Sequence, residues 1–106
     1  MKNQLTLKSL IYLLRHKEEW PEGFEWDFYN NSLSYYKPNC GCAMFLASKK
    51  FITKHMHSSD ICKQLGIEDI PENHRIFLNP EIYGFEEDDY NKVTPEMVAD
   101  KLEELL

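Results

Sequence analysis

The chain has little glycine, proline or cysteine, and it has no long apolar run. Its 106 residues include 4 Gly and 5 Pro, which stand singly and mark no linker, so we expect one domain over residues 1–106. Three cysteines are too few, and odd in number, for a disulfide scaffold, which favours a cytoplasmic location. The apolar stretch Leu10–Leu14 is too short for a signal peptide or a membrane span. We therefore expect no contact with a membrane.

Positive charge is also scarce, and it is unevenly distributed. The net charge is −6, although residues 1–67 carry nine Lys/Arg against six Asp/Glu, a balance of +3. Residues 68–106 carry three Lys/Arg against twelve Asp/Glu, a balance of −9. Nonspecific binding of nucleic acid depends on neutralising phosphates with basic side chains. The charge balance therefore argues against a nucleic-acid partner.

Hydrophobic spacing predicts a series of amphipathic helices. Thr6 suits the N-cap of a helix over 7–18, and a second helix is expected over 41–55. Two short helices should follow, one capped by Ser58 or Ser59 and ended by Gly66, the other opened by Pro71. Thr94-Pro95-Glu96 predicts the start of a final helix, whose buried side should consist of Met97, Val98, Leu102 and Leu105 or Leu106.

Residues 24–29 alternate aromatic and acidic side chains, a period typical of a half-buried strand. Asn30-Asn31 suits a two-residue turn into an antiparallel partner over 32–36. In that register Trp26, Phe28, Leu33 and Tyr35 share one face, and Asp27 and Ser34 share the other. The expected fold class is α+β, a mostly helical single domain packed on a small antiparallel β-hairpin.

Cys40-Gly41-Cys42 lies where a loop is expected to meet the second helix. A thiol at a helix N-terminus has its thiolate stabilised by the exposed amides, so Cys42 is a candidate nucleophile. A cysteine hydrolase also needs a histidine base, and no local pattern selects one among His55, His57 and His74. Because a buried cysteine usually behaves as a small apolar residue, inert packing is the favoured interpretation and we expect no catalytic residue.

Zinc ligands are present, but their spacing is not that of a structural zinc site. Such sites usually pair ligands as C-x2-4-C with a second matching knuckle, whereas Cys40 and Cys42 are separated by one residue. We therefore expect no metal and no cofactor. The candidate donors are Cys40, Cys42, Cys62, His55, His57 and His74.

The acidic stretch Glu86–Asp89 lies in an expected loop over 81–92. Consecutive acids fail the alternating pattern and central glycine of a calcium loop. The remaining alternatives are a solvated loop and a docking surface for a protein partner with basic side chains. The predicted partner-binding residues, with tyrosines as apolar anchors, are Glu81, Tyr83, Glu86, Glu87, Asp88, Asp89 and Tyr90.

Two further patterns suggest other partners. Ile61–Ile67 resembles the turn of a helix-turn-helix module, but acids and Pro71 follow it where base-contacting residues should be. Lys49, Lys50 and Lys54, extended by His55 and His57, form a basic side of the second helix. This side could bind nucleic acid, or it could meet the acidic half of the same molecule or of a second copy in a homo-oligomer.

Several short motifs occur in a familiar order: Trp26-Asp27-Phe28, Cys42-Ala43-Met44, Tyr83-Gly84 and Val93-Thr94-Pro95-Glu96-Met97-Val98-Ala99. With them the chain resembles a loose group of small, uncharacterised bacterial and phage proteins. The resemblance implies a single cytoplasmic domain and transfers no catalytic residue.

Taken together, these patterns favour a small acidic protein that acts as a protein–protein interaction or regulatory module. The alternatives are a cysteine-centred enzyme or a zinc-binding protein that uses Cys42, and a DNA-binding regulator.

Overall fold

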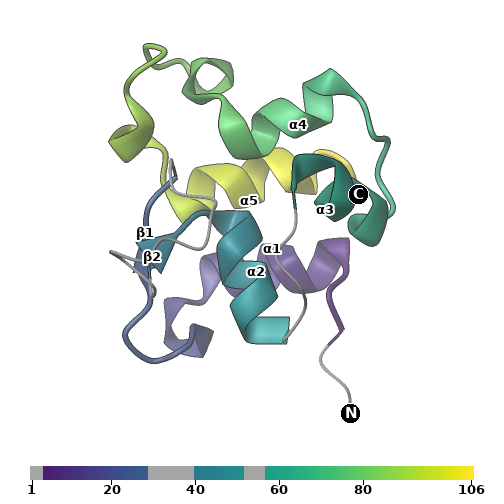
Figure 1. The fold of residues 1–106 in the computed structure, drawn as a ribbon, viewed down its shortest axis with the longest axis vertical. Helices are drawn as coiled ribbons and strands as arrows, with labels where there is room; N and C mark the ends of the chain where they lie inside the picture. Colours follow the sequence, from purple (N-terminus) through teal and green to yellow (C-terminus); the bar gives the residue numbers. More distant parts are fainter. Residues whose placement is uncertain (1–3, 29–39, 52–56) are drawn as a thin grey trace.

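The computed structural model describes residues 4–28, 40–51 and 57–106. Within these ranges most residues are helical, and Figure 1 shows α5 across the middle of the molecule with α4 above it and α1 below it. The α-helices are α1 (Leu7–Arg15), α2 (Ala43–Phe51), α3 (Ser58–Leu65), α4 (Pro71–Leu78) and α5 (Pro95–Glu103). The remaining elements are the 3₁₀ helices η1 (Lys17–Glu19), η2 (Pro80–Tyr83) and η3 (Tyr90–Lys92) and the strands β1 (Glu25–Trp26) and β2 (Cys40–Gly41).

Helix α1 begins as predicted and ends earlier than predicted. The Thr6 hydroxyl accepts a hydrogen bond from the Ser9 amide at 3.0 Å, and the Ser9 hydroxyl oxygen accepts one from the Thr6 amide at 2.8 Å. These bonds satisfy amides that the first helical turn leaves without partners. The helix ends at Arg15 because the Leu13 carbonyl accepts bonds from the His16 amide at 3.2 Å and from the Trp20 indole at 2.7 Å. The predicted extension to residue 18 is therefore wrong.

The other helix boundaries follow local signals. Gly66 ends α3 in the left-handed region with φ of 76°, while Pro71 and Pro95 occupy the first positions of α4 and α5. The Thr94 hydroxyl accepts from the Met97 amide at 3.2 Å. Helix α3 is capped by His57, one residue before the predicted serines. Helix α2 begins at Ala43, and the predicted part over 52–56 lies outside the described residues.

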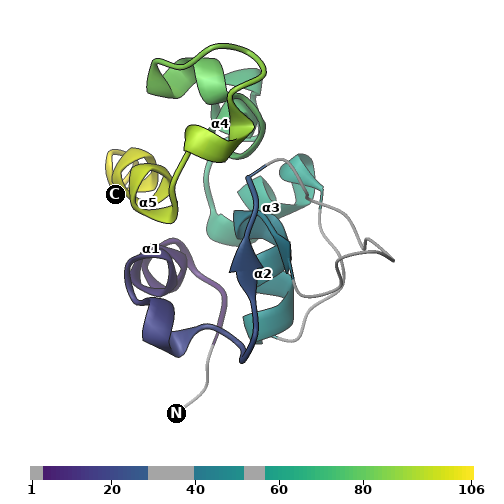
Figure 2. The same cartoon turned by 90° about the vertical axis from the view of Figure 1, so that its left-hand side faces the viewer.

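The described helices share one apolar core. Figure 2 shows α1 and α5 stacked one above the other and seen nearly end-on, with α2 and α3 beside them. Helix α2 is buried from Ala43 to Ser48, which makes it a central helix with no broad solvent-facing side. On α5, Val98 and Leu102 are buried as predicted, but the expectation for the C-terminal leucines is wrong because Leu105 and Leu106 are exposed.

The predicted antiparallel hairpin, and with it the α+β fold class, is wrong. Strand β1 has two residues and pairs in parallel with β2, Glu25 opposite Cys40 and Trp26 opposite Gly41. A parallel pair needs a connection of about a dozen residues, which residues 27–39 supply, whereas a two-residue turn at Asn30-Asn31 would bring the chain back antiparallel. The predicted partner strand over 32–36 lies outside the described residues.

The alternation over 24–28 does describe the burial of its side chains. Phe24 and Phe28 are buried, Glu25 is exposed, and the Trp26 indole donates to the Val93 carbonyl at 2.7 Å. The segment is thus held by its aromatic side chains against helices and loops, together with the two-residue pairing between β1 and β2. The period of two indicates which side chains are buried, but it did not imply an antiparallel hairpin.

Candidate functional site

The predicted partner-binding residues lie on the segment that joins α4 to α5. Glu81, Glu86, Glu87 and Asp88 are exposed, and among the residues that the structure describes none of the four forms an ion pair. Asp89 is half-buried: its carboxylate accepts from the Glu86 amide at 3.3 Å and lies 3.4 Å from the Lys92 ammonium. The segment therefore presents four carboxylates to solvent and uses the fifth to hold its own turn.

The two tyrosines of this segment are half-buried side chains that pack on the core. The Tyr83 hydroxyl donates to the Ile76 carbonyl at 2.7 Å, and its ring lies edge-on to Phe28 with centroids 6.0 Å apart. Burial, with a smaller contribution from Glu104, raises the pKa of Tyr83. Tyr83 and Tyr90 thus anchor the segment to the rest of the protein, and their predicted role as apolar anchors for a partner stays a prediction.

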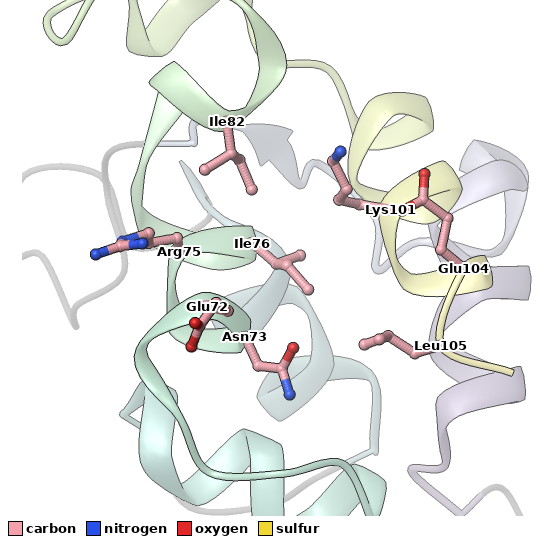
Figure 3. A pocket seen from close by; sticks show the side chains of 8 residues that line it. All are labelled: Glu72, Asn73, Arg75, Ile76, Ile82, Lys101, Glu104 and Leu105. Atoms are coloured by element: carbon pink, nitrogen blue, oxygen red, sulfur yellow. The ribbon is translucent and has the colours of Figure 1, made fainter.

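A groove between α4, η2 and the end of α5 offers such anchors. Its volume is about 250 Å³. In Figure 3 Ile76, Ile82 and Leu105 surround the space between the helices, while Arg75 points away from it. Glu72, Asn73, Lys101 and Glu104 complete the lining. Ile82 follows the exposed Glu81 in η2, and the acidic Glu72 and Glu104 are themselves lining residues, so apolar and acidic side chains meet in the groove.

A second acidic surface lies along α5 where it meets α1. The Arg15 guanidinium contacts Glu96 at 2.9 Å, Asp100 at 2.8 Å and Glu103 at 2.8 Å. The carboxylates, Asp100 first, raise the pKa of Arg15, which stays positively charged. One positive charge therefore meets three negative charges, and this surface keeps a net charge of −2.

The Cys42 thiol is placed for packing and not for reaction. Cys42 has no exposed surface, and burial raises the pKa of its thiol to about 11. The stabilisation of a thiolate by the amides at the helix N-terminus is therefore smaller than the free-energy cost of removing the thiolate from water. The described structure gives no support to an enzyme or zinc site built on Cys42, and the Cys40 side chain lies outside the described part of the chain.

A different cysteine lies beside a carboxylate and an imidazole. The donor atoms of Cys62, Asp69 and His74 all lie within 4.8 Å of one another. His74 Nε2 is 2.5 Å from Asp69 Oδ1, and the Ser59 hydroxyl donates to Asp69 Oδ2 at 2.6 Å. These bonds lower the pKa of Asp69, Ser59 contributing most, whereas burial and then Asp69 raise the pKa of Cys62.

This cluster depends on the turn between α3 and α4. Cys62 is in the last turns of α3, Asp69 follows the glycine cap, and His74 is in the first turns of α4. Cys62 and His74 were among the metal donors expected from the sequence, and Asp69 was not. The pattern C-x6-D-x4-H across a glycine cap and a proline helix start is the signal that could have revealed it.

The basic side of α2 is only partly within the described residues. Lys49 is exposed with its ammonium 5.4 Å from the centre of the Phe45 ring, and Lys50 donates to the Glu19 carbonyl at 2.7 Å. Lys54 and His55 lie outside the described residues, and His57 caps α3. A continuous basic surface on this helix stays a prediction.

Comparison with known proteins adds no assignment: no family model, curated protein or solved structure matches the chain. The resemblance to small bacterial and phage proteins therefore stays a prediction. Among the residues that the structure describes, no helix has both the length and the apolar character needed to cross a bilayer.

Proposed function

We propose that this chain is a protein-interaction module that binds a basic, partly apolar segment of another protein. The observation that carries the proposal is the position of exposed acids beside an apolar groove. Glu81 adjoins Ile82 of the groove, and Glu86, Glu87 and Asp88 continue the same segment without ion pairs among the described residues. A cytoplasmic location and a single domain over 1–106 are part of the proposal.

The chemistry of the groove indicates what the partner should carry. Ile76, Ile82 and Leu105 offer an apolar surface that an aliphatic or aromatic side chain of a partner can cover. Exposed carboxylates attract Lys and Arg from a distance and orient them, which increases the association rate more than the final affinity. The partner should therefore be a segment with at least one large apolar residue and several basic residues.

Charge reversal tests the acidic part of the proposal. E86K/E87K/D88K changes the net charge from −6 to 0, because each substitution adds two charges. E18K/E22K/E25K makes the same change with exposed acids of the N-terminal half. After co-purification and identification of the partner, titration calorimetry should show at least about 10-fold weaker binding for the first variant. Similar binding by both variants, or unchanged partner recovery, would contradict the role of these acids.

A matched pair of C-terminal variants tests the groove. Leu105 is 39% exposed and lines the groove, whereas Leu106 is 62% exposed and is not among its lining residues. Leu105→Glu and Leu106→Glu introduce the same charge one residue apart near the end of the chain. Leu105→Glu should weaken binding of the same partner, and Leu106→Glu should leave it nearly unchanged. Equal effects of the two substitutions on partner binding would contradict the role of the groove, because they would result from the added charge alone.

A further inference from the structure

We propose that Cys62, Asp69 and His74 bind one Zn²⁺ ion at the turn between α3 and α4. This differs from the expectation, drawn from the spacing of cysteines and histidines, that the chain binds no metal. It is independent of the proposed interaction function, because none of the three residues is among the groove lining or the exposed acids.

The donor set suits zinc better than other common ions. A thiolate, an imidazole and a carboxylate are the three side-chain ligands that zinc accepts, usually in tetrahedral geometry. Calcium and magnesium prefer oxygen donors alone, so the sulfur and nitrogen of this cluster argue against them. Three protein donors leave a fourth tetrahedral position, which water would fill.

The distances require only small side-chain movements. Zinc bonds of about 2.0–2.3 Å at tetrahedral angles separate the donor atoms by about 3.5 Å. The three donors now lie within 4.8 Å of one another, and the Asp69–His74 pair is at 2.5 Å. Binding would therefore open the Asp69–His74 hydrogen bond by about 1 Å and draw the more distant donor inward by a similar amount.

The backbone that carries the donors is already fixed. The Cys62 carbonyl accepts from the Ile67 amide at 3.0 Å, which closes the turn after α3. Asn73, a buried polar residue, donates through its side chain to the Glu68 carbonyl at 2.7 Å. Ser59 holds one oxygen of Asp69 and leaves the other facing His74. An outer hydrogen bond of this kind orients a ligand before the metal arrives.

The arrangement favours a cation over a reactive thiolate. Cys62 has no exposed surface, so a substrate could not reach its sulfur in this conformation. The neighbouring Asp69 carboxylate disfavours a negative sulfur, so the Cys62 thiol would release its proton to solvent as the bond between sulfur and the divalent cation forms. Side-chain exposures of 32% for Asp69 and 29% for His74 leave two of the three donors within reach of an ion from solvent.

Cobalt provides a direct test, because a cobalt–thiolate bond gives a charge-transfer absorption in the near ultraviolet. Titration of the reduced, chelator-treated full chain with Co²⁺ should develop this band to one ion per chain, and Zn²⁺ should abolish it by replacement. Cys62→Ala should remove the band. Ser59→Ala removes a hydrogen bond to a ligand and should weaken Co²⁺ binding by roughly 10- to 100-fold. Asp69→Asn and His74→Gln remove the ligands themselves and should weaken Co²⁺ binding by more than that.

Two control variants locate the ion. His16→Gln removes a histidine at the C-cap of α1, and Cys42→Ala removes a second buried thiol, so both should retain the band. Asp69→Asn and His74→Gln alter partly exposed side chains and keep the test decisive if Cys62→Ala does not fold. The absence of a thiolate band in the unaltered chain would overturn the proposal. Binding of Co²⁺ by Asp69→Asn and His74→Gln with the same affinity as by the unaltered chain would also overturn it.

Discussion

Replacing Arg15 is expected to loosen the attachment of α1 to α5. Arg15→Gln removes the guanidinium that contacts Glu96, Asp100 and Glu103 and leaves a shorter, neutral polar side chain. The arginine side chain is 27% exposed, and its three partners are more than half exposed. The contacts are therefore surface ion pairs, and their contribution to the free energy of unfolding is that of partly exposed pairs.

The expected loss of unfolding free energy is about 1–3 kcal/mol. A surface ion pair contributes about 0.2–1 kcal/mol, and three pairs set the upper end of the range. Sharing of one guanidinium keeps the sum below three independent pairs, so we expect a value near the middle. Because the Debye length falls from about 10 Å at 0.1 M salt to about 3 Å at 1 M, the loss should shrink by about half at high salt.

Urea denaturation followed by tryptophan fluorescence measures this loss, with Trp20 and Trp26 as reporters. Arg75→Gln is the matched control, because Arg75 is exposed on α4 and forms no ion pair among the described residues. A loss for Arg15→Gln that equals the loss for Arg75→Gln would refute the reasoning. So would a loss that does not change between 0.1 M and 1 M salt.

Two further predictions concern the core and a helix end. Burial raises the pKa of Cys42 from 9.0 to about 11, so the folded chain holds this proton more tightly than the unfolded chain. Stability should be complete below pH 9 and fall by up to about 3 kcal/mol as the pH rises toward 11, measured as the urea midpoint. Cys42→Ala should reduce this fall in stability without abolishing it, because the pKa values of Cys62 and Tyr83 are also raised. A urea midpoint of the unaltered chain that stays constant from pH 9 to 11 would contradict the raised pKa of Cys42. Gly66→Ala should cost about 1 kcal/mol from the φ of 76° alone, since nothing lies within 4 Å of the added carbon, and Gly66→Asn should cost less because Asn tolerates this region.

A prediction from the sequence was correct where its physical cause acts between near neighbours in the chain. It failed where the cause is a contact between distant segments. Thr94-Pro95 and Gly66 were placed correctly because a cap depends on atoms within a few residues of itself. The antiparallel hairpin built on the strand at 24–29 was wrong because alternation reports burial, and burial here comes from helices elsewhere in the chain. The packing of Tyr83 could not be predicted for a related reason: its hydroxyl is bonded to Ile76 and its ring meets Phe28, a contact between distant segments.

The cluster of Cys62, Asp69 and His74 is an intermediate case. Its members are separated by seven and five residues, and both helix ends that bring them together were predicted. The sequence pattern does not predict the angle between α3 and α4. This angle decides whether the His74 imidazole lies near the Cys62 thiol. That angle results from packing of the two helices in the common core.

The amino-acid sequence by itself determined where α1, α4 and α5 begin, where α3 ends and how charge divides between the two halves, because these properties depend on near neighbours and on composition. Only the tertiary structure decided that β1 pairs with Cys40–Gly41, that Cys42 is sealed from solvent, and that a carboxylate and an imidazole lie beside Cys62. The physical reason is that desolvation and side-chain contacts depend on which segments meet in space, and residues distant in the chain set that outcome together.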